Sequence, residues 1–124
     1  IIEMKEIYRY LIKKKEECKI IGLLADQSPV KSESNYWTTF LNQKTAVYLG
    51  PEKISKKFKY PVLFCSMKKV KRGYYEVFIE ELCTNPEKTS EGEITSIYLR
   101  KVEEKINEQP EYWLWTHRRW KHKK

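Results

Sequence analysis

The chain has 124 residues, and its 25 Lys and Arg outnumber its 17 Asp and Glu, which gives a formal net charge of +8. This length supports one hydrophobic core, so we expect a single domain over residues 1–124. The 4 Trp, 9 Tyr and 4 Phe exclude a disordered chain, and no apolar run approaches the roughly 18 to 20 residues of a membrane-spanning helix.

The N-terminal part predicts a helix followed by a buried strand. From Met4 onward, apolar residues recur at i, i+3, i+4, i+7 and i+8, which predicts an amphipathic helix from residue 2 to about 16. Residues 19–25 are short, almost wholly apolar and directly followed by Asp26, which is typical of a strand buried on both faces. A polar loop should follow, and then a short extended piece over residues 36–41.

The middle of the chain predicts a helix and then a β-hairpin. We expect helix over residues 45–58, interrupted at Gly50-Pro51, with Gly50 as its cap and Pro51 at the first helical position. Residues 61–70 and 74–82 flank Arg72-Gly73, a pattern that predicts a hairpin with one half-exposed arm.

The C-terminal part predicts one long helix and a tail. Ser90 and Glu93 form a capping-box pattern before an apolar periodic run, which predicts a helix over residues 90–109 that Pro110 ends. Residues 110–124 form an aromatic-basic tail. The order of elements predicts an α/β fold, a mixed β-sheet flanked by helices.

Asp26 and Gln27 are the first candidate site residues. They follow a predicted buried strand directly, and in open α/β sheets ligands bind just beyond the carboxyl ends of strands. A carboxylate there can orient a neighbouring His or Arg, and the amide can donate to a carbonyl or an oxyanion. The alternative is a turn-forming Asp that satisfies its own backbone.

The tail supplies the second set of candidates. Arg118 and Arg119 suit bidentate contact with phosphate or carboxylate, or pairing with sheet acids such as Glu76 or Glu80. His117 has no acid near it in sequence, so we expect it to be structural or to contact phosphate. Residues 117–124 hold five basic residues and no acid, which suits nucleic acid, anionic lipid or a phosphorylated substrate; a solvated tail is the alternative.

The sequence predicts no metal site and no cofactor. The three cysteines, Cys18, Cys65 and Cys83, are far apart and form no CxxC pair, and both histidines lie in the tail, so buried free thiols are expected. The sequence also contains no Gly-rich phosphate-binding motif.

Four stretches, residues 21–27, 40–54, 71–76 and 109–121, together resemble the lipid A biosynthesis acyltransferases, the late lauroyl and myristoyl transferases of Gram-negative bacteria. The most specific piece is PEYWLWTHRRWK at residues 110–121. The resemblance covers most of the chain and matches the C-terminal half of the family, so it implies part of a glycerolipid-acyltransferase-like α/β domain.

The resemblance also implies a reaction. The family transfers a fatty acyl chain from acyl carrier protein to a hydroxyl of a phosphorylated glycolipid, at the cytoplasmic face of the inner membrane. A His–acid pair in an H-x4-D/E motif takes the proton of that hydroxyl. Neither His117 nor His122 begins such a motif, and the chain does not start with Met. We therefore expect a soluble C-terminal fragment of a membrane-associated enzyme, inactive by itself.

By the same resemblance, Asp26 and Gln27 would support the catalytic site, and Arg118, Arg119 and Lys121 would bind substrate. The expected partners are acyl carrier protein, the phosphorylated glycolipid and an anionic membrane surface, with no nucleic acid. Two alternatives stay open: an autonomous basic module that binds nucleic acid or anionic lipid, and a half-domain that self-associates through an unpaired sheet edge.

Overall fold

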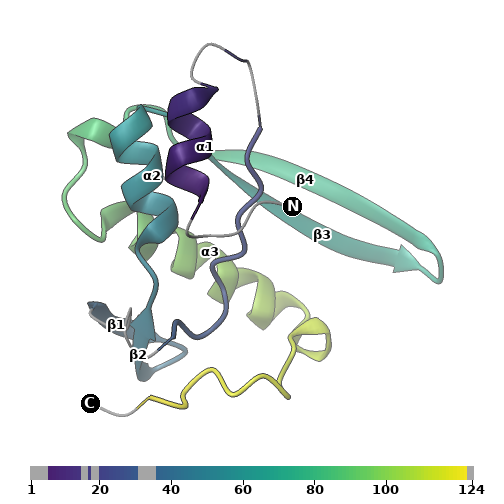
Figure 1. The fold of residues 1–124 in the computed structure, drawn as a ribbon. Coiled ribbons are helices and arrows are strands. Elements are labelled where there is room, and N and C mark those ends of the chain that lie inside the picture. The colour runs from purple at the N-terminus through teal and green to yellow at the C-terminus, as the bar shows by residue number, and fades with distance from the viewer. Residues whose placement is uncertain (1–5, 15–16, 18–19, 31–35, 123–124) are drawn as a thin grey trace.

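A computed structural model of the chain describes residues 6–14, 17, 20–30 and 36–122. Within these ranges the chain forms helices, strands and two short 3-10 segments (Figure 1). In chain order they are α1 (Ile7–Lys13), β1 (Tyr36–Phe40), β2 (Gln43–Val47), α2 (Gly50–Phe58), β3 (Val62–Lys71), β4 (Tyr74–Cys83), the 3-10 segment Pro86–Lys88, α3 (Glu93–Glu108) and the 3-10 segment Pro110–Tyr112.

Helices and strands are combined as expected for an α/β protein, and the fold class is confirmed. The described strands pair as two separate antiparallel hairpins, β1–β2 and β3–β4, where the sequence predicted one mixed sheet. Leu41 and Asn42 connect β1 to β2 with positive φ angles of 49° and 59°. Such angles at both central residues define the tight turn that joins antiparallel strands with the correct twist.

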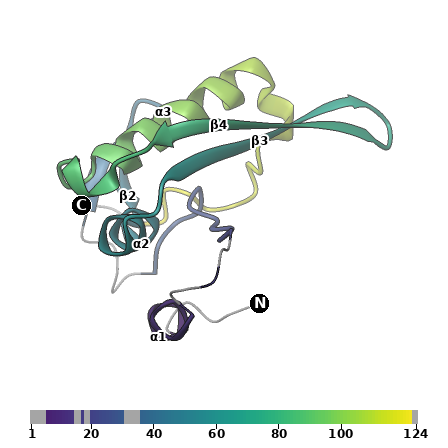
Figure 2. The same ribbon diagram turned by 90° about the horizontal axis from the view of Figure 1, so that it is seen from above.

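The main core lies where α3 meets both hairpins. Figure 2 shows α3 running along the base of the β3–β4 hairpin, and its apolar stripe packs against side chains from β1, β2 and β3. Trp113 and Trp120 from the tail pack against the same cluster, where large aromatic rings fill the core. The buried members of the cluster are Phe40, Val47, Phe64, Leu99, Val102 and Ile106.

The buried strand predicted over residues 19–25 is wrong for its described part, residues 20–25, which form no strand. Ile21 and Leu23 pack against a second cluster made by Ile7 and Leu11 of α1 and Ile54 of α2. The alternate side chains are exposed: Ile20 is 97% accessible and Leu24 is 84% accessible. None of the described strands pairs with this segment, and only every second apolar residue is partly buried against the helices.

The helix predicted over residues 45–58 is confirmed from Gly50 and wrong before it. Residues 45–47 belong to β2, where they are buried and pair with β1. The pairing overrides the helical pattern because it buries Thr45, Ala46 and Val47 against the core. The cap of α2 is Leu49, so Gly50 is inside the helix instead of capping it.

The remaining elements follow the sequence closely. The β3–β4 hairpin and α3 are confirmed, and the N-terminal helix is confirmed for the described residues 7–13; residues 1–5 and 15–16 lie outside the described ranges. The capping box is present too: a Glu93 oxygen accepts hydrogen bonds of 2.8 Å from both the backbone N–H and the hydroxyl of Ser90. No described helix is long and apolar enough to cross a bilayer.

The cysteine prediction is half right. Cys65 and Cys83 are free thiols, and Cys18 lies outside the described residues. Cys65 is exposed instead of buried, because β3 belongs to a two-stranded hairpin with no second sheet packed on that face. An apolar run in a two-stranded ribbon therefore does not imply burial.

Candidate functional site

The loop after residue 25 is tied to the C-terminal tail by hydrogen bonds. The backbone N–H of Ser28 donates to His117 Nε2 at 3.0 Å, and the Ser28 hydroxyl contacts the carbonyl oxygens of Arg118 and Arg119 at 3.2 and 2.5 Å. Nearby, His122 Nε2 donates to the Pro29 carbonyl at 2.8 Å. Two segments about ninety residues apart in sequence therefore form one unit.

His117 has a structural role in this unit. Because Nε2 accepts the Ser28 hydrogen bond, the neutral imidazole carries its proton on Nδ1. His122 uses its Nε2 as a donor. Neither ring contacts a carboxylate in the contacts described, which agrees with the expectation that His117 is structural.

Arg119 is the most buried charged side chain of the tail. It is 3% exposed, and its Nη1 donates to the Ala46 carbonyl at 2.8 Å. The guanidinium carbon lies 5.6 Å from the centre of the Phe40 ring, a cation–π arrangement. Nε and Nη2 are buried and have no hydrogen-bond partner among the described residues. The guanidinium is thus held by β2 and one aromatic ring, with two donors still unused.

Asp26 and Tyr98 act on Arg119 through charge. Burial lowers the pKa of the Arg119 guanidinium, whereas Asp26 and Tyr98 oppose that shift. Burial also raises the pKa of the Tyr98 hydroxyl to about 12; the negative charge of Asp26 adds to this rise and a hydrogen bond with the Ala25 backbone reduces it. We call Asp26, Tyr98 and Arg119 the Asp26–Arg119 site.

The structure divides the site residues predicted from sequence into two groups. The negative charge of Asp26 favours the charged form of the buried Arg119. That Asp26 orients this arginine stays a prediction. Gln27, Arg118 and Lys121 are exposed and point to solvent-accessible surface. The alternative pairing of the arginines with hairpin acids is not seen for Glu80, which pairs with Lys101 of α3 at 3.1 Å.

We expect Arg119→Met to leave the free energy of unfolding within about 1 kcal/mol of the wild-type value. The change removes a desolvated charge with two unpaired donors while keeping most of the apolar side-chain volume. Urea unfolding measures this. Arg118→Met, at the exposed neighbouring position, is the control. A loss of about 3 kcal/mol or more for Arg119→Met would show that the buried guanidinium is a net stabilising group.

Glu52 has a structural role that the sequence did not reveal. Although it belongs to α2, its buried carboxylate caps α3: it accepts from the N–H groups of Gly92 at 2.6 Å and Thr95 at 2.9 Å, and from the Thr95 hydroxyl at 2.6 Å. Gly92 has φ of 82°, and a Cβ there would lie 2.1 Å from the Tyr36 hydroxyl oxygen, so the position requires glycine.

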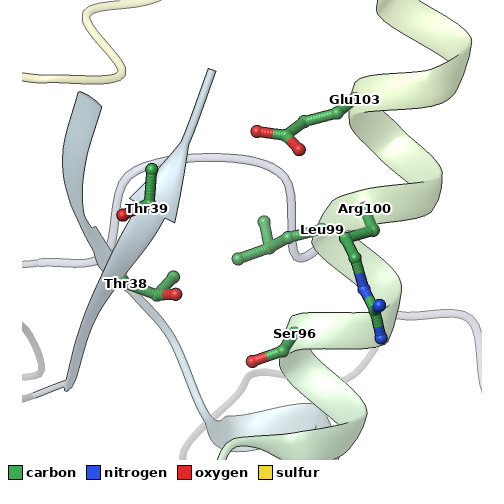
Figure 3. A pocket seen from close by; sticks show the side chains of 6 residues that line it. All are labelled: Thr38, Thr39, Ser96, Leu99, Arg100 and Glu103. Carbon is green, nitrogen blue, oxygen red and sulfur yellow. The ribbon is translucent and has the colours of Figure 1, made fainter. Parts of the chain in front are cut away.

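A small hollow lies between β1 and α3, and Figure 3 shows the side chains that line it. The Glu103 carboxylate accepts a hydrogen bond from the Leu41 backbone N–H. The volume of about 200 Å³ is below that of typical ligand sites, which begin near roughly 300 Å³. None of the site residues predicted from sequence lines it. The lining residues are Thr38, Thr39, Ser96, Leu99, Arg100 and Glu103.

Comparison with protein families decides the relationship. The family model described as "Bacterial lipid A biosynthesis acyltransferase" matches residues 1–122, almost the whole chain. The chain belongs to this family. Searches of curated proteins and of solved structures gave no match. The acyltransferase family was recognisable from the sequence alone, and its match confirms the resemblance carried by residues 21–27, 40–54, 71–76 and 109–121.

The residues around the Asp26–Arg119 site belong to stretches that resemble the family. Two of the family-like stretches, residues 21–27 and 109–121, are the segments that Ser28, His117 and His122 tie together. A third, residues 40–54, supplies Ala46 and Thr45, which accept hydrogen bonds from Arg119 and from Trp120 Nε1, the latter at 2.8 Å. Three of the four stretches that carry the resemblance therefore meet in one place, whereas residues 71–76 lie at the tip of the β3–β4 hairpin.

Proposed function

We propose that the chain is part of an enzyme that transfers a fatty acyl chain from acyl carrier protein to a hydroxyl of a phosphorylated glycolipid. The family match over residues 1–122 carries this proposal. In the reaction the thioester C–S bond breaks and an ester C–O bond forms. The acceptor hydroxyl gives up its proton, and the carrier thiolate leaves and takes up a proton.

The Asp26–Arg119 site is proposed to support that reaction by positioning, and not by touching the reacting atoms. Its arginine is buried and its side chain donates to β2, while its backbone carbonyl accepts a hydrogen bond from Ser28, so the tail holds the loop at residues 26–29 next to β2. Gln27 at the exposed end of this loop would face the catalytic groups. A rigid loop stabilises the geometry of a neighbouring catalytic centre because side chains on it lose little freedom on substrate binding.

Arg118 and Lys121 are the proposed substrate contacts. Both are exposed and lie beside the buried Arg119 on the same tail. Cationic side chains in this position suit the phosphates of the glycolipid or the acidic surface of the carrier protein. The enzyme would work at the cytoplasmic face of the inner membrane, where its lipid acceptor is found.

The catalytic base is proposed to come from outside the residues matched here. His117 Nε2 is occupied by the Ser28 N–H and His122 Nε2 by the Pro29 carbonyl, so neither is poised to take a proton from a substrate. The 124-residue chain by itself should therefore show no turnover. Transfer by this chain alone would contradict that part of the proposal.

An acyl-transfer assay tests the function. The protein that carries this sequence is supplied with acyl-acyl carrier protein and a phosphorylated glycolipid precursor. Mass spectrometry then measures the mass of the glycolipid. We expect a gain of one acyl chain. Arg118→Gln with Lys121→Gln should lower kcat/KM about tenfold or more through lost phosphate contacts. Lys44→Gln, an exposed lysine of β2, is the matched control. No gain of an acyl chain would refute the function.

A further inference from the structure

The β3–β4 hairpin projects from the body of the molecule (Figure 1). Beyond its base, Lys69 Nζ lies 5.8 Å from the centre of the Tyr112 ring. On one face, Glu80 pairs with Lys101 of α3, and the Phe64 ring lies 5.8 Å from the ring of Tyr98. Phe64 and Glu80 are paired across the strands and so share this face. Side chains alternate along a strand, so the residues next to them point to the opposite face.

That opposite face is apolar and uncovered. The cross-strand pairs Cys65–Ile79 and Met67–Val77 lie next to each other on this face. Met67 and Ile79 are each 67% exposed, and Val77 is also exposed. Cross-strand apolar pairs of this kind usually lie against a core. Here the described residues place nothing over them.

Towards the tip, apolar side chains are exposed on both faces. Phe78 pairs with Ser66, on the face that Phe64 occupies at the base, yet it is exposed. Val70, Tyr74 and Tyr75 are exposed as well. Contiguous exposed apolar side chains mark protein or membrane contacts, and a lipid interface can take up side chains from both faces of a narrow ribbon. Exposure on both faces therefore favours a lipid environment.

The tip also carries a local positive charge. Residues 67–77 contain Lys68, Lys69, Lys71 and Arg72 against the single acid Glu76, so 4 − 1 gives +3. Lys71 Nζ lies 4.2 Å from the centre of the Tyr74 ring. Tyrosines beside long basic side chains are typical of protein segments at membrane surfaces, where the ring sits among headgroups and the cation meets lipid phosphate.

We infer that the hairpin tip, residues 67–77, docks in the headgroup region of an anionic bilayer. This inference deepens the proposed function by naming a membrane contact outside the tail. The ribbon has only two strands, so its outer backbone groups need water, which keeps it at the interface and out of the hydrocarbon core. A second copy of the chain is disfavoured because two +3 tips would repel each other.

Vesicle co-sedimentation of the full 124-residue chain tests this. The vesicles are pure phosphatidylcholine, or phosphatidylcholine mixed with phosphatidylglycerol. We expect clear binding to the mixed vesicles and about tenfold weaker binding to the neutral ones. Lys68→Gln, Lys71→Gln and Arg72→Gln together should weaken binding to the mixed vesicles about tenfold or more. No acyl donor is present, so the result is independent of the acyl-transfer assay.

Two further variants separate the tip from net charge. Lys44→Gln, Lys53→Gln and Lys88→Gln remove the same charge from exposed sites on the body and should change binding less than threefold. Met67→Ser, Val77→Thr and Ile79→Thr remove the apolar face and should weaken binding to both vesicle types. Equal losses for the tip and body charge variants would overturn the inference. So would light scattering that shows self-association abolished by the Met67, Val77 and Ile79 changes.

Discussion

Glu52→Ala is expected to lower the free energy of unfolding by about 3 kcal/mol or more. The carboxylate is buried and accepts three hydrogen bonds, two from Thr95 and one from Gly92. Alanine leaves these donors without a partner and removes a negative charge from the positive end of the α3 dipole. Urea unfolding followed by circular dichroism measures the loss.

The controls for Glu52 separate the cap from simple charge removal. Glu52→Gln keeps one acceptor oxygen but turns an NH2 group towards an N–H donor, so an intermediate loss of about 1 to 2 kcal/mol is expected. Glu91→Ala removes an exposed acid next to Gly92 and should change stability by less than about 0.5 kcal/mol. If Glu52→Ala and Glu91→Ala have the same small effect, the carboxylate does not hold α3.

Phe40→Ala is expected to cost about 3 to 5 kcal/mol, the usual range for truncating a buried Phe. Phe40 is fully buried, and its ring lies 6.1 Å from Trp113 and 6.4 Å from Trp120. It also lies against the Arg119 guanidinium. Alanine opens a cavity beside a desolvated charge, so the tail should loosen together with the core.

Two readouts test the role of Phe40. Urea unfolding gives the stability, and the intrinsic fluorescence of Trp113 and Trp120 should shift to longer wavelength as water reaches their rings. Phe78→Ala, on the exposed hairpin, is the matched control and should change stability by less than about 0.5 kcal/mol. A Phe40 variant as stable as the Phe78 variant would place the core elsewhere.

Elements held by local signals were predictable from the sequence. Helix α3 carries its capping box, its apolar stripe and a Pro that ends it, and the β3–β4 hairpin carries its turn at Arg72-Gly73. The β1–β2 hairpin was not predicted, because its turn at Leu41-Asn42 lacks the usual glycine and its second strand reads as a helix start. Residues 20–25 were misassigned because an apolar run does not reveal whether another strand lies beside it.

The candidate site was predictable only in part. The position of Asp26 after an apolar segment and the sequence signature of the tail indicated Asp26 and Arg119, and the two residues interact through charge. Nothing in the sequence indicated that Arg119 is buried while Arg118 is exposed, because that depends on which side of the tail meets β2. Glu52 was missed since its partners are forty and more residues away.

The bonds from Ser28 to the tail also bear on how the protein is made. They join residues separated by 89 to 91 positions, and the last partners are within a few residues of the end of the given sequence. Synthesis proceeds from the N-terminus, so Asp26 leaves the ribosome long before Arg119 does. Closing so long a loop is slow compared with forming a helix or a hairpin. The Asp26–Arg119 site is therefore expected to assemble late in folding, and a nascent chain that stops short of residue 117 lacks its arginine and the bonds that tie the loop to the tail.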